Sequence, residues 1–342
     1  MPVLLRVSFL LLSSFAGTAV LAAQQGAPAN RISLDVVVTD KSGKPVVGLQ
    51  QGDFTVLDNK VARPIATFSA VSGQQVPTEV VLLVDAVNTN YDHIAYEREE
   101  IDKFLRAGGG HLAHPTALAI FTDTGTQLQE GFTTDGNGLS ESLDQAPIGL
   151  REIRRDSGFF GAEDRLQLSL TALSMLVAKE AARPGRKIIL WVSPGWPLLS
   201  GPESNLQFKE EQKILVQIEE LSTTLRRGNI TLYSIDPLGT GEGVARLYDY
   251  QAFLKGVSKP NQVQLGDLGL QVLAVQSGGL ALSASNNVSG LLERCIADRE
   301  SYYELSFDAP PGERSEEYHQ VDIKVAKPGL TARTRTGYYS LP

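Results

Sequence analysis

Residues 80–90 read VVLLVDAVNTN, an apolar run that ends in Asp85 and then breaks into small polar residues. A short apolar run bounded by turn residues is typical of a strand that is buried on both faces, as in parallel sheets. Open α/β sheets bind their ligands at the carboxyl ends of the strands. Asp85 therefore marks a candidate site. It either holds a metal ion or substrate, or only shapes the loop that follows it.

From residue 79 onward, alternating strand-like and helix-like segments predict a mostly parallel sheet with helices on both faces. The strand-like runs are EVVLLVD, TALAIFTD, RKIILWVSP, NITLYSIDP and GGLALSAS. The helix-like segments between them include 92–106, 164–182, 207–227 and 287–298. In the first helix, the apolar residues are predicted to face the sheet, and Glu97 and Glu100 are predicted to lie on the opposite, polar face.

Strand patterns flank this α/β region on both sides. Residues 31–71 combine runs such as ISLDVVVTD with turn residues, and residues 300–342 return to strands after the last helix. Two or three strands alone need something to pack against. We therefore predict that the two ends of the chain together form one β-sandwich module, with the α/β domain of residues 79–299 inserted between them.

The N-terminus has the pattern of a secretory signal: Arg6 precedes an apolar run, and small residues precede Gln24. We expect cleavage near residue 23, so that residues 1–23 are removed and the protein is periplasmic or secreted. The apolar run is short and interrupted, and no stable membrane span is expected after cleavage.

Charge and cysteine content exclude further classes. The formal net charge is −8 at pH 7, which argues against nucleic acid as a partner because the phosphate backbone would be repelled. The only cysteine, Cys295, cannot form an internal disulfide, and its helical spacing with Leu291 and Leu292 predicts a buried position.

Four stretches carry a family resemblance. They are ISLDVVVTDKSGKPVVGLQQGDFTVLDNK (32–60), VVLLVDAVNT (80–89), PGRKIILWVSPGW (184–196), and the C-terminal pair SYYELSFD (301–308) and VDIKVAKPGLTARTRTGYYS (321–340). Together they resemble the von Willebrand factor A (VWA) proteins of the VWFA-related family that is abundant in Acidobacteria. The resemblance implies a Rossmann-like, doubly wound VWA domain plus the β-module, and a protein-binding role.

The resemblance also implies a cation site with a defined pattern. VWA domains typically bind a divalent cation through an Asp-x-Ser-x-Ser loop after the first strand. In this chain the three positions are Asp85, Val87 and Thr89. Mg²⁺ prefers oxygen ligands, and the aliphatic Val87 offers none.

The other two expected ligands of that pattern depart from it as well. An Asp-Gly pair normally ends the fourth strand, where this chain has Ser193 and Pro194. The position of the family's threonine has no clear match, and Asp164 and Ser169 are the candidates. The metal loop is therefore interpreted as degenerate.

We predict a non-enzymatic module that binds an unidentified protein partner without a cofactor, with Asn88, Asn90 and Trp196 as contact residues at the carboxyl edge of the sheet. For Trp196, a ring folded over its own loop is the alternative interpretation. The alternative is an adhesion module dependent on Mg²⁺ or Mn²⁺, in which Asp85 and Thr89 are metal ligands.

A hydrolase is the third interpretation. Asp123 begins an Asp-Thr-Gly triplet like that of aspartic proteases, but those enzymes need two such aspartates, and no second triplet lies in a comparable strand-loop context. Ser193 lacks the flanking pattern of a nucleophile elbow. His111 and His114 follow a run of glycines and are interpreted as a surface pair on a loop.

Overall fold

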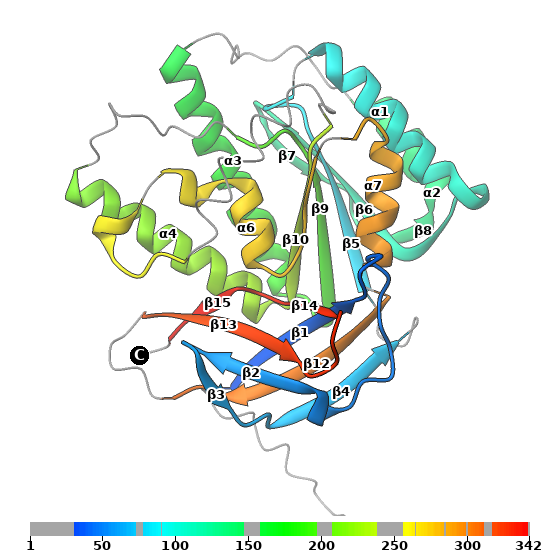
Figure 1. The fold of residues 1–342 in the computed structure, drawn as a ribbon. Coiled ribbons are helices and arrows are strands. Elements are labelled where there is room, and N and C mark those ends of the chain that lie inside the picture. Colours follow the sequence, from blue (N-terminus) through cyan, green and yellow to red (C-terminus); the bar gives the residue numbers. More distant parts are fainter. Residues whose placement is uncertain are drawn as a thin grey trace, which may run out of the picture.

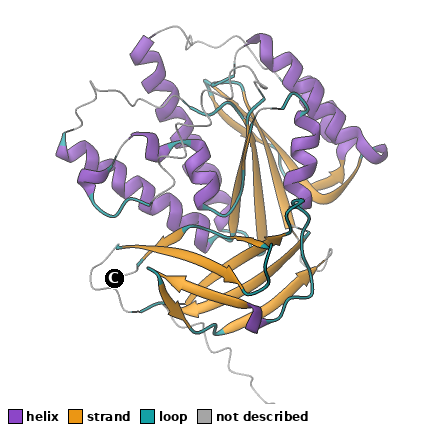
Figure 2. Ribbon diagram, viewed as in Figure 1, coloured by secondary structure: helices purple, strands orange, loops and turns teal. Residues whose placement is uncertain are grey.

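The computed structural model describes residues 31–72, 78–89, 91–146, 158–196, 207–237, 256–263, 265–283, 285–298, 300–310 and 317–340. The predicted signal segment, residues 1–23, lies outside these ranges. Figure 1 shows an α/β domain above a smaller block of strands. The helices lie on both sides of the central sheet of the upper domain (Figure 2).

The α/β domain contains a seven-stranded sheet, and six of its strands follow the order β11-β10-β9-β5-β6-β7. Their bounds are β5 Thr78–Asp85, β6 His111–Thr122, β7 Gly125–Leu128, β9 Arg186–Val192, β10 Ile230–Ile235 and β11 Ala281–Leu282. Only β7 and the seventh strand, β8 (Thr133–Asp135), run antiparallel to their neighbour β6. From β5 the chain first adds strands on one side of the sheet, and with β9 it continues on the other side. This reversal between β5 and β9 is characteristic of a doubly wound fold.

The apolar run of β5 is explained by the helices on the two faces. Val80, Leu82 and Val84 pack with α1 (Tyr91–Arg106), α2 (Gly136–Gln145) and α7 (Val288–Ala297). The alternate residues Val81 and Leu83 pack with α3 (Gly158–Ala181), α4 (Phe208–Arg227) and α6 (Leu270–Gln276). Because successive side chains of a strand point to opposite faces, both sets are buried, and no polar residue interrupts the run.

The second block consists of two antiparallel four-stranded sheets. One has the order β14 (Thr331–Arg333), β1 (Arg31–Thr39), β12 (Ser301–Asp308) and β4 (Thr67–Ser72). The other has the order β15 (Gly337–Tyr339), β13 (Tyr318–Val325), β2 (Phe54–Asp58) and β3 (Val61–Arg63). Alternate residues of both sheets, such as Leu34, Val56 and Phe307, form one shared core. Strands from the two ends of the chain therefore build a β-sandwich, and the predicted fold class is confirmed.

Short 3-10 turns complete the secondary structure: η1 Gln51–Asp53, η2 Ala107–Gly109, η3 Pro260–Gln262 and η4 Leu265–Leu268. The glycines 108–110, interpreted from the sequence as part of a loop with the two histidines, span only η2 and the residue after it. His111 and His114 already belong to β6. The hairpin of β6 and β7 contains Asp123 in its turn, a feature that the strand-helix alternation did not predict.

The two blocks are joined by a buried ion pair. Arg186 begins β9 and is almost completely buried, and its Nη2 donates to Asp35 Oδ2 on β1 at 2.6 Å. The guanidinium also lies 3.6 Å from the centre of the Tyr302 ring on β12. Arg186 of the α/β domain therefore contacts Asp35 and the Tyr302 ring of the β-sandwich.

Within the described residues, no helix is long and apolar enough to cross a membrane.

Cys295 lies on α7 with no exposed surface, as its helical spacing predicted. Burial raises the pKa of its thiol, and the reactive thiolate is therefore disfavoured.

We expect the Cys295 thiol of the native protein to react with a disulfide reagent more than about a hundredfold more slowly than the same thiol in protein unfolded in urea. Release of thionitrobenzoate from Ellman's reagent measures both rates. Equal rates would contradict the burial of Cys295 on α7.

Candidate functional site

The candidate site lies where the strand order reverses. β5 and β9 are neighbours in the sheet, with Val84 paired to Val192. Asp85 is the last residue of β5, and Ser193 directly follows β9. In a doubly wound sheet the crevice between these two strand ends is the place where ligands bind.

Five donors of the chain itself surround the Asp85 carboxylate. Its Oδ1 accepts hydrogen bonds from the backbone N–H groups of Val87 and Asn88, both at 2.9 Å. Its Oδ2 accepts from Asn88 Nδ2 at 2.8 Å, from Trp191 Nε1 at 3.1 Å and from Ser193 Oγ at 2.7 Å. Asp85 has no exposed surface. Burial raises the pKa of Asp85, while these hydrogen bonds act in the opposite direction.

This arrangement does not fit a divalent cation. A carboxylate offers about four lone-pair sites, and five donors already share those of Asp85. Val87, at the second position of the expected loop, is fully buried. The Ser193 hydroxyl gives its proton to Asp85 and accepts from the backbone N–H of Gly195 at 2.9 Å, so it too is engaged. Among the described residues, no group of three or more acidic, histidine or cysteine side chains has an arrangement for a metal ion.

Asn88 faces the interior. It is 4% exposed, and its Nδ2 donates both to Asp85 and to Ser169 Oγ, the latter at 2.9 Å. Ser169 in turn donates to the backbone carbonyl of Arg165 at 2.7 Å. The structure therefore brings Ser169, one of the two candidates for the threonine position, to the Asp85 loop, whereas Asp164 is exposed. Asn88 ties the loop to α3, and the expectation of a side chain at the surface is corrected.

Trp196 is also inside the protein. It is 2% exposed, its Nε1 donates to the Leu268 carbonyl at 2.6 Å, and its ring lies edge-on to Trp191 at 5.7 Å. The prediction that this side chain is presented at the surface is wrong, because the loop after β9 folds its aromatic residue back over the sheet. Asn90, the third predicted contact residue, lies outside the described residues.

Glu97 on α1 is a buried member of the site that the sequence interpretation placed on the polar face of the helix. Glu97 has no exposed surface and Glu100 is 6% exposed, so both predictions were wrong. Neither carboxylate oxygen of Glu97 has a hydrogen-bond partner. Burial, and then the charges of Asp85 and Asp236, raise the pKa of Glu97 well above its usual range. The Thr89 hydroxyl opposes this shift from a position that lacks the geometry of a full hydrogen bond.

The Glu97 environment predicts a pH-dependent stability. A carboxyl group whose pKa is higher in the folded state binds its proton more tightly there, so stability falls as pH rises above the ordinary value of 4.5. The slope is about 1.4 kcal/mol per pH unit inside the window between the two pKa values. Glu97→Gln is expected to flatten this slope and to be at least as stable as the wild type at alkaline pH.

Urea unfolding followed by circular dichroism between pH 5 and pH 9 measures the effect. Asp85 contributes a slope of the same sign, so the variant should remove part of the dependence. Glu99→Gln, two residues further along on the exposed side of the same helix, is the matched control and should leave the slope unchanged. An unchanged slope in Glu97→Gln would contradict the raised pKa of Glu97.

Comparisons with known proteins show structural similarity at low sequence identity. No protein-family model and no curated protein matches the sequence. The chain is similar to the VWA domain of SpRpn10, with 14% identity and a TM-score of 0.31 over 65% of this chain and 96% of that one. It is similar to the N-terminal domain of TFIIH p34, with 13% identity and a TM-score of 0.30 over 65% and 97% of the two chains.

A third similarity is to the PilB minor pilin from Streptococcus sanguinis, with 11% identity and a TM-score of 0.35. It covers 66% of this chain, which spans 62% of the length of the pilin. We draw no conclusion about the function of this chain from these three structures. The fold class therefore rests on the strand order and the helix placement described above.

Proposed function

We propose that this chain is an exported, non-enzymatic module of the VWFA-related kind, which binds a protein partner through the loops at the carboxyl edge of its parallel sheet without a bridging metal ion. The observation that carries the proposal is the Asp85 carboxylate with its five internal donors. The loop is shaped by the chain's own hydrogen bonds, so a cation is not needed to order it.

The buried residues of the site act as supports in this proposal. Asn88 ties the loop to α3, and Trp196 fixes the segment after β9 to η4. Contact with a partner then falls to residues on the outside of the same edge. Thr124, in the turn between β6 and β7, is exposed there, and Asn90 remains a predicted contact residue. Loops that are already held in place by buried residues lose less conformational entropy when a partner binds.

The absence of catalysis is part of the proposal. Ser193 is the one nucleophile considered from the sequence, and its hydroxyl is bonded to Asp85 and Gly195. Within the described residues no histidine forms a hydrogen bond with Ser193, so no general base is positioned to activate it. This supports binding over hydrolysis.

Site-specific photocrosslinking tests the proposal. The chain without residues 1–23 carries p-benzoylphenylalanine either at Thr124, on the proposed edge, or at Asp322, an exposed position on β13 of the sandwich. Each protein is irradiated with the exported proteins of the source organism, in EDTA or in MgCl₂. We expect a discrete crosslinked species at position 124 in both buffers, and none at position 322.

Each other outcome has a defined meaning. A crosslink at position 124 that disappears in EDTA would favour the metal-dependent adhesion module. Equal crosslinking at both positions would contradict the assignment of the carboxyl edge as the binding surface. No crosslink at position 124 in either buffer would contradict the proposal directly.

A further inference from the structure

A long edge strand lies on the side of the β-sandwich that faces away from the α/β domain. In the order β14-β1-β12-β4, β4 is the last strand, and Figure 1 shows it at the lower margin of the smaller block. β4 has six residues, whereas the other strands that end the three sheet orders, β14, β15, β3, β11 and β7, have two to four. An edge strand of this length presents a row of N–H and C=O groups to which another strand can pair.

The backbone of β4 is open on this side. Among the described residues, no hydrogen bond from a segment other than β12 reaches the backbone of residues 67–72. The side chains of Thr67, Ser69, Ala70 and Ser72 are exposed. The outer side of β4 is therefore accessible to an incoming strand.

This edge also lacks the usual protection against pairing. Natural edge strands are commonly blocked by charged residues or by proline, and β4, with the sequence TFSAVS, has neither. β3 ends the second sheet at the same margin (Figure 1), and its Val61 is 54% exposed. The one charged residue between positions 61 and 72 is Arg63, which forms an ion pair with Asp58 at 3.1 Å. The β3–β4 edge, residues 61–72, is thus a compensated and partly apolar surface.

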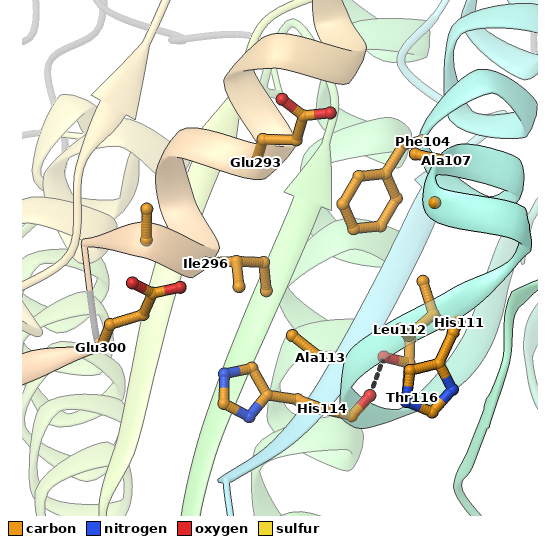
Figure 3. A pocket seen from close by; sticks show the side chains of 12 residues that line it. Phe104, Ala107, His111, Leu112, Ala113, His114, Thr116, Glu293, Ile296 and Glu300 are labelled. Carbon is orange, nitrogen blue, oxygen red and sulfur yellow. Dashed lines mark hydrogen bonds between the residues drawn. The ribbon is translucent and has the colours of Figure 1, made fainter. Parts of the chain in front are cut away.

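Charge favours this edge as the contact with a second copy of the chain. The formal net charge is −8, so two copies repel each other over much of their surface. The cavity of about 370 Å³ in Figure 3 is an example, because Glu293 and Glu300 lie on its α7 side and oppose the approach of another acidic chain. At the β3–β4 edge this repulsion is absent.

The sequence of β4 is complementary to itself in one antiparallel register. A two-fold axis through Ser69 places this residue opposite its own copy. Phe68 then faces Ala70 of the second copy, so that a large ring meets a small side chain. Thr67 faces Val71, which is a pair of β-branched residues. Each residue opposes one of the same parity, so the core-facing side chains of both copies stay on one face of the sheet, and no like charges meet.

We propose that two copies of this chain pair antiparallel along β4, so that their four-stranded sheets join into one continuous sheet across a two-fold axis. The contact is small, so the dimer is reversible, with a dissociation constant on the order of 100 μM. The carboxyl edge of the α/β domain takes no part in the contact and stays open for the proposed partner.

Sedimentation equilibrium of the chain without residues 1–23 tests the association, from about 5 μM to about 1 mM, a range that brackets this constant. Ser69→Lys places two like charges opposite each other across the axis and is expected to weaken the dimer about fivefold. Thr55→Lys adds the same charge at an exposed position of β2, which is an inner strand, and should leave the dissociation constant unchanged.

Cysteine crosslinking tests the register. In Ser69→Cys the two new residues oppose each other, and Cα atoms about 4.5–5.5 Å apart suit a disulfide. In Ser72→Cys, an exposed position of the same strand, the two copies of residue 72 lie six residues out of register, about 20 Å apart. Mild oxidation should therefore give a covalent dimer of the first variant and not of the second. Cys295 is buried and does not compete.

Circular dichroism confirms that each variant is folded. A protein that stays monomeric up to about 1 mM overturns the proposal, because a self-pairing edge would associate in this range. The proposal also fails if Ser69→Lys associates as well as the wild type, if Thr55→Lys weakens the dimer as much as Ser69→Lys, or if Ser72→Cys crosslinks as readily as Ser69→Cys.

Discussion

Asp85→Ala is expected to lower the free energy of unfolding by about 3–5 kcal/mol, the range for removing one partner of a buried charged network. The loss has a clear origin. The substitution leaves the indole N–H of Trp191 and the hydroxyl of Ser193 without their acceptor in the interior, and the Asn88 amide keeps only its bond to Ser169. Each buried donor without a partner costs about 1–3 kcal/mol. Urea unfolding at pH 7, followed by circular dichroism, measures the change.

The same variant separates the two interpretations of Asp85. If the residue is a structural acceptor, the destabilisation is the same in EDTA and in MgCl₂, and Mg²⁺ does not raise the melting temperature of the wild type. If Asp85 is a metal ligand, Mg²⁺ stabilises the wild type by mass action and has no effect on the variant. Asp164→Ala is the matched control, because Asp164 is exposed on α3; its expected effect is within about 0.5 kcal/mol. A loss below about 1 kcal/mol in Asp85→Ala would contradict the network.

The parts of the structure that follow from local patterns were predictable. The apolar run of β5 and the helix stripes gave the mostly parallel sheet, and the boundaries of α4 and α7 lie within one residue of those expected. The interpretation of the metal loop as degenerate, drawn from the aliphatic Val87, stays a prediction. These features depend on residues close together in the chain, where periodicity carries the information.

The interior of the site was not predictable in the same way. Glu97 follows Ile94 by three residues and precedes Ile101 by four, which is the spacing of the buried stripe, but its charge placed it on the polar face. Tertiary packing overrides that preference, and the cost appears in its raised pKa. Asn88 and Trp196 were expected outside because their loops lie at the edge of the sheet. Their partners, Ser169 and Leu268, are 81 and 72 residues away in sequence, so no local pattern contains these contacts.

The second large effect is expected at the junction of the two blocks. Asp35→Ala should lower the free energy of unfolding by about 3 kcal/mol, because it removes the carboxylate that lies 2.6 Å from the Arg186 guanidinium, whose side chain is 1% exposed. The cation–π contact with Tyr302 persists but replaces only part of the interaction, about 2 kcal/mol at a desolvated site. We also expect the unfolding of the β-sandwich and of the α/β domain to separate into two transitions.

Asp308→Ala provides the matched control in the same sandwich. Asp308 pairs with Arg31 at 2.9 Å, but both side chains are substantially exposed, so its removal should cost less than about 1 kcal/mol. Adding Arg186→Met to Asp35→Ala should restore part of the lost stability, because the second change removes the buried charge whose ion pair with Asp35 the first change breaks. If Asp35→Ala and Asp308→Ala have equal effects, the ion pair does not couple the two blocks. If the double variant is less stable than Asp35→Ala alone, the stacking of Arg186 on Tyr302 contributes more than the ion pair.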